Sequence, residues 1–125
     1  MNTLYDRIGG EQAFDKLASE FYKGVAEDPL LRPMYPEEDL GPAERRLRMF
    51  LEQYWGGPKT YQEERGHPRL RMRHSAFSIG PAARDAWITH MRRAMDSLKL
   101  APADEAELWG YLERAAHAML NRFSD

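Results

Sequence analysis

Residues 11–26 read EQAFDKLASEFYKGVA, and the spacing of the apolar side chains in this stretch decides the fold class. Apolar residues recur at intervals of three and four positions, which places them on one stripe of a helix from about Glu11 to Ala26. The stripe consists of Phe14, Leu17, Ala18, Phe21, Tyr22 and Val25. The stretch therefore predicts an amphipathic α-helix with one buried face.

Glycine and proline residues mark where the neighbouring elements begin and end. Gly9-Gly10 separates the long helix from a shorter one that contains Leu4. Asp28-Pro29 pairs a side-chain acceptor with a proline, which is typical of the start of a helical turn. Pro33 and Pro36 are expected to end that turn quickly.

Further helices are expected in the second half of the chain, each beginning at or near a proline. They begin near Pro42, Pro68, Pro81 and Pro102. The first of them stops at Gly56-Gly57-Pro58, and residues 59–66 show no period and are expected to form a long loop. The helix at Pro68 is short and places Leu70, His74 and Phe77 on one side, so His74 is expected to face inward.

The composition agrees with an all-α fold. The chain has 125 residues, of which 42% are hydrophobic and 30% charged, and its formal net charge is -2. It contains one valine, three isoleucines and three threonines, so residues that favour strands are scarce. This size and balance predict one globular domain over residues 1–125 and exclude an intrinsically disordered chain.

The absence of cysteine narrows the chemistry further. It excludes disulfides, iron–sulfur clusters, thiolate zinc sites and covalent haem attachment, so any metal must be held by His, Asp, Glu or a cofactor. No apolar run approaches the roughly 20 residues needed to span a bilayer, and the N-terminus lacks a signal-peptide pattern. We therefore expect no membrane span and a cytoplasmic location.

Four histidines are candidate metal ligands, and none lies in a closely spaced pair typical of a zinc site. His67 precedes a proline in the expected loop, while His90 and His117 lie at the edges of apolar stripes, where packed or half-exposed histidines are common. His74 is different, because it lies on the apolar side of a short helix after an irregular stretch. It is either a buried structural histidine or a ligand.

A locally basic stretch surrounds this histidine, with cationic residues at alternate positions. Alternation spreads the side chains around a helix, and the whole chain is slightly acidic, so we expect a solvated face and no nucleic acid partner. A guanidinium beside an inward histidine could instead meet the carboxylates of a buried cofactor. Tyr22 and Trp87 each carry a donor on an apolar stripe, and by spacing alone such aromatic residues are usually core.

Several motifs, taken together, make the chain resemble a known family. They are Gly9-Gly10, Phe21-Tyr22, residues 25–28, Met34-Tyr35-Pro36, residues 48–58 (RMFLEQYWGGP), residues 66–74 (GHPRLRMRH) and Asp85-Ala86-Trp87. On these residues, over about Leu4 to Asn121, the chain resembles the group II truncated haemoglobins of actinobacterial type (truncated haemoglobin O). The resemblance implies a truncated globin fold, a two-over-two helical sandwich around a non-covalent haem b.

The resemblance also implies roles for individual residues. His74 matches the proximal ligand of the haem iron, and Tyr22, Tyr35 and Trp87 match positions that line the opposite, ligand-binding side. Ala43 matches the position where many globins place a distal histidine or glutamine, so hydrogen bonds to the ligand must come from elsewhere.

Other matched positions would hold the porphyrin. Packing on the ring is implied for Leu47, Phe50, Leu51, Leu70 and Phe77, and Arg46 and Arg73 are candidates for the propionates. Tyr35 stands where globins at large usually have phenylalanine, so a second phenol faces the ligand. Which of Tyr22 and Tyr35 makes the main contact stays open.

The function expected from this resemblance is the binding of dioxygen and other diatomic ligands at a haem, with high affinity and slow release. Redox chemistry on nitric oxide, peroxide or sulfide is open, including nitric oxide dioxygenase or peroxidase-like activity. The alternative is a haem-free helical interaction module on a globin fold, against which an intact His74 argues. The sequence leaves open the reductase that would recycle the iron and the oligomeric state, a homo-oligomer included.

Overall fold

The amphipathic helix predicted from the apolar stripe is present as α2 (Gly10–Ala26) in the computed structural model, which describes residues 3–35, 38–59, 61, 63 and 79–119. Every member of the predicted stripe is buried. A shorter helix, α1 (Leu4–Ile8), precedes it, and Gly9 joins the two at φ 117°, in the left-handed region that favours glycine. The expected break at the glycine pair is therefore confirmed.

The segment from Asp28 to Tyr35, called the 28–35 segment below, is a capped turn followed by a short 3₁₀-helix, η1 (Arg32–Met34). One carboxylate oxygen of Asp28 accepts hydrogen bonds from the backbone N–H groups of Leu30 and Leu31 at 2.8 and 3.3 Å. Asp28 thus starts the turn as predicted. The expectation that Pro33 ends it is wrong, because a proline fits the first turn of a helix and Pro33 lies within η1.

The next helix, α3 (Gly41–Tyr54), matches the prediction and ends just before Gly56-Gly57. The long loop expected over residues 59–66 is wrong at Tyr61 and Glu63, and residues 60, 62 and 64–66 lie outside the described part of the chain. Tyr61 and Glu63 are helical, and the backbone N–H of Glu63 donates to the carbonyl of Lys59 at 3.1 Å. Tyr61 is also buried against Phe50, so tertiary packing supplies what the local apolar pattern lacks.

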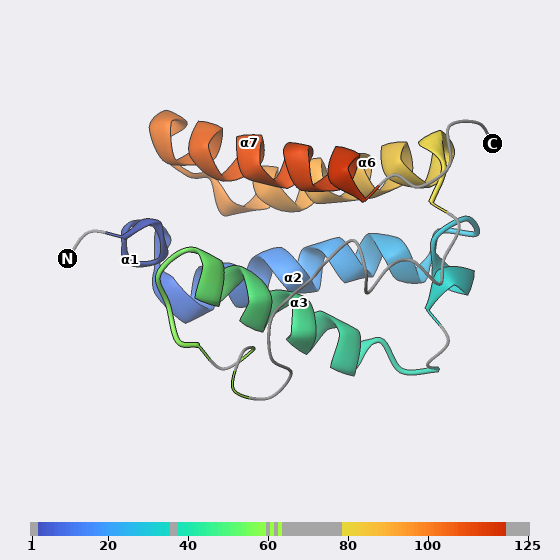
Figure 1. The fold of residues 1–125 in the computed structure, drawn as a ribbon, viewed down its shortest axis with the longest axis horizontal. Helices are drawn as coiled ribbons and strands as arrows, with labels where there is room; N and C mark the ends of the chain where they lie inside the picture. Colours follow the sequence, from blue (N-terminus) through green and yellow to red (C-terminus); the bar gives the residue numbers. More distant parts are fainter. Residues whose placement is uncertain (1–2, 36–37, 60, 62, 64–78, 120–125) are drawn as a thin grey trace.

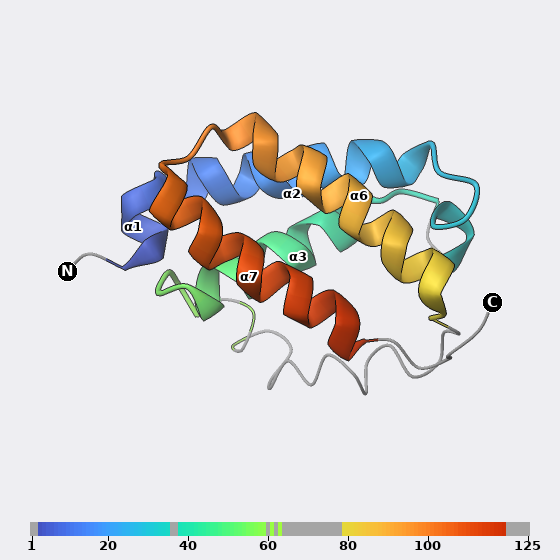
Figure 2. The same cartoon turned by 90° about the horizontal axis from the view of Figure 1, so that it is seen from above.

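Two long helices complete the described chain, α6 (Pro81–Leu98) and α7 (Pro102–Ala118), each beginning at its proline. They form one layer above a second layer made of α2 and α3 (Figure 1). Seen from above, α6 overlies α2, and α7 lies toward the side of the molecule on which α3 is seen (Figure 2). The expected all-α, two-over-two arrangement is confirmed. Among the described helices, none is both long and apolar enough to cross a membrane.

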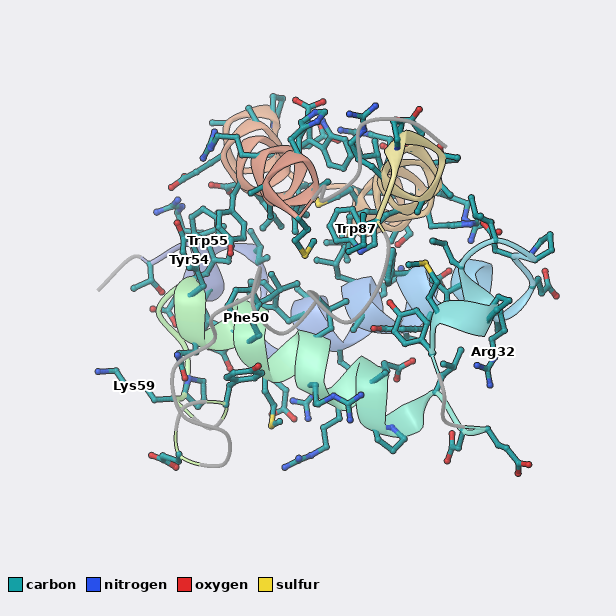
Figure 3. The ribbon with its side chains drawn as sticks, turned by 45° about the vertical axis from the view of Figure 1, so that its right-hand side comes forward. Arg32, Phe50, Tyr54, Trp55, Lys59 and Trp87 are labelled. Atoms are coloured by element: carbon teal, nitrogen blue, oxygen red, sulfur yellow. The ribbon has the colours of Figure 1, made fainter. Side chains whose placement is uncertain are left out.

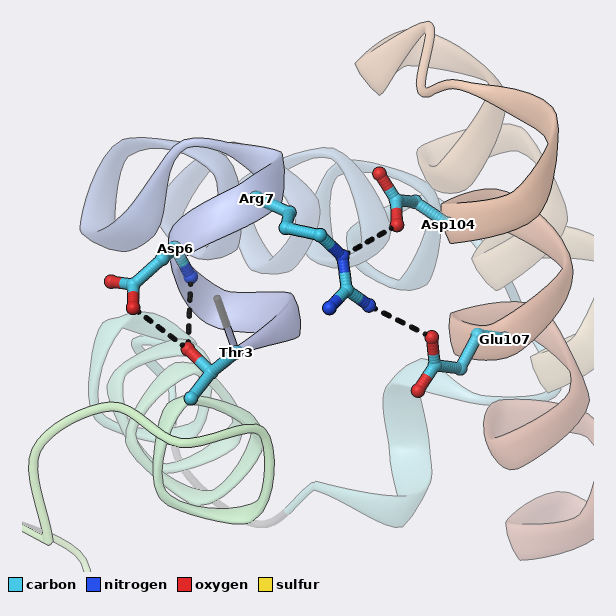
Figure 4. A network of polar contacts seen from close by, with 5 residues as sticks. All are labelled: Thr3, Asp6, Arg7, Asp104 and Glu107. Carbon is cyan, nitrogen blue, oxygen red and sulfur yellow. Dashed lines mark hydrogen bonds and ion pairs between the residues drawn. The ribbon is translucent and has the colours of Figure 1, made fainter. Parts of the chain in front are cut away.

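The core lies between the two layers. Its completely enclosed side chains come from α2, α3, α6 and α7: Phe14, Leu17, Phe21, Val25, Leu51, Met91, Met95, Leu108 and Leu112. At the end where the chain starts, Arg7 of α1 ties the layers together through ion pairs to Asp104 and Glu107 of α7, both at 2.9 Å (Figure 4).

One charged group is buried with this core. Glu52 of α3 is only 4% exposed, and its carboxylate pairs with Arg48 one turn earlier at 3.0 Å. Burial raises the pKa of Glu52, and the Arg48 guanidinium opposes that rise. Removing either partner of this pair would leave an unpaired charge at a buried position on α3, which would destabilise the fold.

Arg48→Met should therefore lower the free energy of unfolding by about 3 kcal/mol at neutral pH, because it leaves the Glu52 carboxylate buried without its cation. Guanidinium denaturation measures this. The matched control is Lys23→Met, which breaks the exposed pair with Glu20 and should cost under about 1 kcal/mol. Equal losses in the two variants would contradict the interpretation of Glu52.

Candidate functional site

Two of the predicted ligand-facing residues, Tyr22 and Tyr35, meet although they belong to different elements. Tyr22 lies on the buried stripe of α2 and is 7% exposed, whereas Tyr35 follows η1 and is half-buried. Their rings meet edge to face at 5.5 Å, and their hydroxyl oxygens lie 3.4 Å apart. This separation is longer than a usual bond between hydroxyl groups, so the two phenols bind each other weakly.

Trp87 joins the same group of aromatic side chains from the other layer. Phe21 is the link, because its ring contacts Tyr22 at 5.0 Å and Trp87 at 5.4 Å. Figure 3 shows Trp87 on the side of α6 that faces the lower layer, above Phe50 of α3. Tyr22, Tyr35 and Trp87, which carry two phenolic hydrogens and one indole hydrogen, therefore belong to one group of aromatic side chains linked through Phe21. Tyr22, Tyr35 and Trp87 are called the three donors below.

Backbone contacts fix the position of Tyr35. Its N–H donates to the carbonyl of Arg32 at 3.2 Å, and its own carbonyl accepts from the Arg32 guanidinium at 3.0 Å. The N–H of Arg32 in turn donates to the carbonyl of Asp28 at 2.9 Å. A continuous series of hydrogen bonds thus connects Tyr35 to Asp28 along the 28–35 segment.

Asp28 is also in contact with the other layer. Nε2 of His90, on α6, lies 2.6 Å from the second carboxylate oxygen of Asp28, and both side chains are largely buried. The hydrogen bond from His90 lowers the pKa of Asp28. His90 is therefore a packed histidine, as its sequence position suggested, but one that joins α6 to the 28–35 segment.

An apolar wall on α3 faces this group. Phe50 is buried at 8% exposure, and Leu47 is partly covered beside the core. Leu51 is enclosed by the core at 1% exposure, and Ala43 is buried at 3%. Ala43 brings no polar side-chain atom to the site, which leaves the hydrogen-bonding chemistry to the three donors.

The remaining predicted site residues fall into two sets. Arg46 lies on α3 directly before Leu47 and is half-buried. Leu70, Arg73, His74, Phe77 and the loop residue His67 lie outside the described residues. His117 is exposed on α7 and His90 is engaged with Asp28, so neither of these histidines faces the three donors as a bare imidazole.

Sequence reasoning missed the contact between His90 and Asp28. Each residue carried a local signal, an apolar-stripe edge for His90 and a capping position for Asp28. Nothing in one sequence indicates that residues 62 positions apart will pair. The same holds for Phe21, whose role as the link between two donors comes from the approach of α2 to α6.

Haem is flat and largely apolar, with carboxylates on one edge, and the described residues fit such a group. Leu47, Tyr35 and Trp87 are apolar or aromatic side chains that pack against the core yet remain only partly covered. Arg46 places a cation next to this surface. The polar atoms on these side chains are few: the hydroxyl of Tyr35, the indole nitrogen of Trp87 and the guanidinium of Arg46.

Comparisons with known proteins agree with this geometry. The family model of the bacterial-like globins matches residues 3–121. The chain is 43% identical to the group 2 truncated hemoglobin YjbI of Bacillus subtilis over 121 residues, which cover 97% of this chain and 90% of that protein.

Solved structures are similar over nearly the whole chain. A thermostable hemoglobin from the actinobacterium Thermobifida fusca matches with a TM-score of 0.95 and 63% identity, covering 96% of this chain and 98% of that chain. The truncated oxygen-avid haemoglobin from Bacillus subtilis matches with a TM-score of 0.89 and 43% identity, covering 96% and 100%. The chain therefore belongs to the bacterial-like globin family, as a group II truncated haemoglobin whose cofactor is haem.

Proposed function

We propose that this protein binds dioxygen tightly at a haem and releases it slowly, through hydrogen bonds from Tyr22, Tyr35 and Trp87. The observation that carries the proposal is the meeting of the two phenols, 3.4 Å apart in a largely buried aromatic group that also contacts Trp87 through Phe21. The similar truncated haemoglobin from Bacillus subtilis is itself described as oxygen-avid.

Haem would be held from both faces and at its edge. The proposal assigns His74 as the iron ligand, Leu47, Phe50, Leu51, Leu70 and Phe77 as the porphyrin contacts, and Arg46 and Arg73 as partners of the propionates. Support for His74 comes from the other two histidines that were expected on helices, because His90 is hydrogen-bonded to Asp28 and His117 is exposed. A neutral imidazole is the usual iron ligand in globins.

When bound, haem supplies an open coordination position that takes a diatomic ligand and shifts negative charge onto it. The three donors act on that charge. Because Tyr22 and Tyr35 are held by a helix and by the hydrogen-bonded 28–35 segment, little reorganisation is needed when their hydroxyls turn toward a ligand. Their mutual bond is long, so exchanging it for a bond to a charged ligand is favourable.

Slow release suits redox chemistry or sensing better than transport, since a carrier must unload its ligand. Redox chemistry on nitric oxide, peroxide or sulfide belongs to the same proposal. Dioxygenation of nitric oxide would leave the iron ferric, so repeated turnover of that reaction would need a reductase, and we include such a partner in the proposal. A cytoplasmic location belongs to the same proposal and is supported by the absence of cysteine, which is typical of proteins that need no disulfides.

His74→Gly should abolish stable haem binding, or permit it only with added imidazole, because it removes the proposed iron ligand while leaving a space that imidazole fits. The absorption band of haem in the violet, measured on purified protein with and without imidazole, reports this. His117→Gln, an exposed histidine on α7, is the control and should keep the wild-type spectrum. An unchanged spectrum in His74→Gly would refute the assignment.

Arg46→Ala and Arg73→Ala should each speed haem loss to an acceptor protein. A half-exposed ion pair is worth on the order of 1 kcal/mol or less, so the acceleration should be about fivefold or smaller. Arg7→Gln is the control: it removes a cation that pairs with Asp104 at the start of α7 and should leave the rate of haem loss unchanged. If neither variant differs from this control, these arginines do not hold the propionates.

Tyr22→Phe, Tyr35→Phe and Trp87→Phe should each accelerate dioxygen release by roughly ten- to a hundredfold, because a hydrogen bond to a charged group is worth about 1.5 to 3 kcal/mol. Combined variants should be non-additive, since neighbouring donors compensate for one another. Stopped-flow displacement of dioxygen from the ferrous protein measures the rates. Rapid release in the wild type, unaltered by all three substitutions, would remove the support for tight binding.

A further inference from the structure

We infer that His90 is a positioning residue for the distal side of the site: through Asp28 it holds the 28–35 segment, and with it Tyr35, at a fixed distance from α6 and Trp87. This inference rests on the proposed function, because it assumes that Tyr35 and Trp87 act on the ligand. Neither His90 nor Asp28 contacts the three donors through any interaction described above, so their effect would be indirect.

His90 is held firmly between α2 and Asp28. Its Nε2 lies 2.6 Å from Asp28, and the two side chains are 17% and 15% exposed, so the contact is largely shielded from water. The ring also lies directly against α2: a Cβ built on Gly24 would be 2.3 Å from Nδ1 of His90. Only glycine at position 24 leaves room for the imidazole between α2 and α6.

Asp28 holds the 28–35 segment through several hydrogen bonds. One of its carboxylate oxygens takes the His90 contact, while the other accepts the N–H groups of Leu30 and Leu31. Its backbone carbonyl accepts the N–H of Arg32, whose guanidinium and carbonyl then bind the backbone of Tyr35. Asp28 is thus the point where the segment that carries Tyr35 is attached to α6.

Trp87 lies on α6, the helix that also carries His90. It lies three residues before His90, so the two side chains share one side of α6 about one turn apart. Trp87 contacts Phe21, and Phe21 contacts Tyr22, which in turn contacts Tyr35. The hydrogen bond between His90 and Asp28 connects α6 to the other end of the 28–35 segment. Tyr35 is therefore fixed both by its ring and by its backbone.

The test compares His90→Phe with His90→Gln. Phenylalanine keeps the ring volume and removes the hydrogen bond, whereas glutamine places an amide N–H near the position of Nε2 and can still donate to Asp28. In His90→Phe the amides of Arg32 and Tyr35 should lose protection against hydrogen exchange. The C–O stretching band of the carbon monoxide complex should shift or broaden, and dioxygen release should accelerate about three- to tenfold, less than for outright loss of a donor. His90→Gln should restore most of each property.

Two further variants separate positioning from general loosening of the fold. Arg7→Gln also breaks ion pairs between distant elements, on α1 and α7, and should change neither the C–O band nor dioxygen release. In a Tyr35→Phe background, His90→Phe should add little further acceleration, because the residue it positions no longer carries a hydroxyl. If His90→Phe does not fold, His90→Leu takes its place, since it removes both ring nitrogens and leaves the Asp28 carboxylate to accept from Leu30 and Leu31.

The outcomes are distinct. If Tyr35→Phe speeds release but His90→Phe, or His90→Leu in its place, leaves release and the C–O band unchanged, the positioning role is wrong and the proposed function stands. If His90→Phe accelerates release equally in the wild-type and Tyr35→Phe backgrounds, or Arg7→Gln has the same effect, the role is likewise overturned. If only Tyr22→Phe speeds release, the positioning role is wrong while the proposed function stands. If the wild type releases dioxygen rapidly and none of Tyr22→Phe, Tyr35→Phe and Trp87→Phe alters the rate, the proposed function fails, and this inference fails with it.

Discussion

The close approach of α2 to α6 is the constraint on which the rest of the structure depends. It is possible because α2 presents Gly24 at the crossing, where even a methyl group would collide with His90, and because small Ala94 of α6 is completely buried in the core. At this separation one ring, Phe21, reaches both Tyr22 on its own helix and Trp87 on the facing one. Donors from two layers can then act on one ligand.

Under the proposed function, this arrangement would let a site with no distal histidine or glutamine bind a ligand that carries negative charge. Ala43 leaves the usual position apolar, and the hydrogen-bonding capacity moves to three aromatic side chains that bury large apolar surfaces around a single polar hydrogen each. Such groups lose little side-chain entropy when they are fixed. In surroundings of low polarity their hydrogen bonds to a charged ligand are also strengthened.

Much of the fold could be predicted from the sequence, because its helices carry strong local signals. The apolar stripe predicted α2 correctly, and the prolines at the first positions of α6 and α7 predicted correctly where those helices begin. The local signal at Pro33 was misread, because a proline fits the first turn of a helix and Pro33 lies within η1. At Tyr61 the apolar pattern gave no signal, although this residue is helical and its ring packs on Phe50.

Less of the candidate site than of the fold could be predicted from the sequence. Periodicity placed Tyr22 and Trp87 on buried stripes but could not distinguish them from ordinary core residues, and only the family resemblance suggested a role in ligand binding. No local pattern indicated Tyr35, whose position depends on a series of backbone hydrogen bonds that begins at Asp28. The pairing of Asp28 with His90 depends on the tertiary fold, which a single sequence does not display.

The most direct test of the central claim is a crystal structure of the haem-loaded ferrous protein with a diatomic ligand bound. The account predicts that Nε2 of His74 binds the iron. It also predicts that at least one phenolic oxygen of Tyr22 or Tyr35, together with the indole nitrogen of Trp87, lies within about 2.7 to 3.2 Å of the ligand. A structure in which another histidine binds the iron, or in which all three donors turn away from the ligand, would contradict the account.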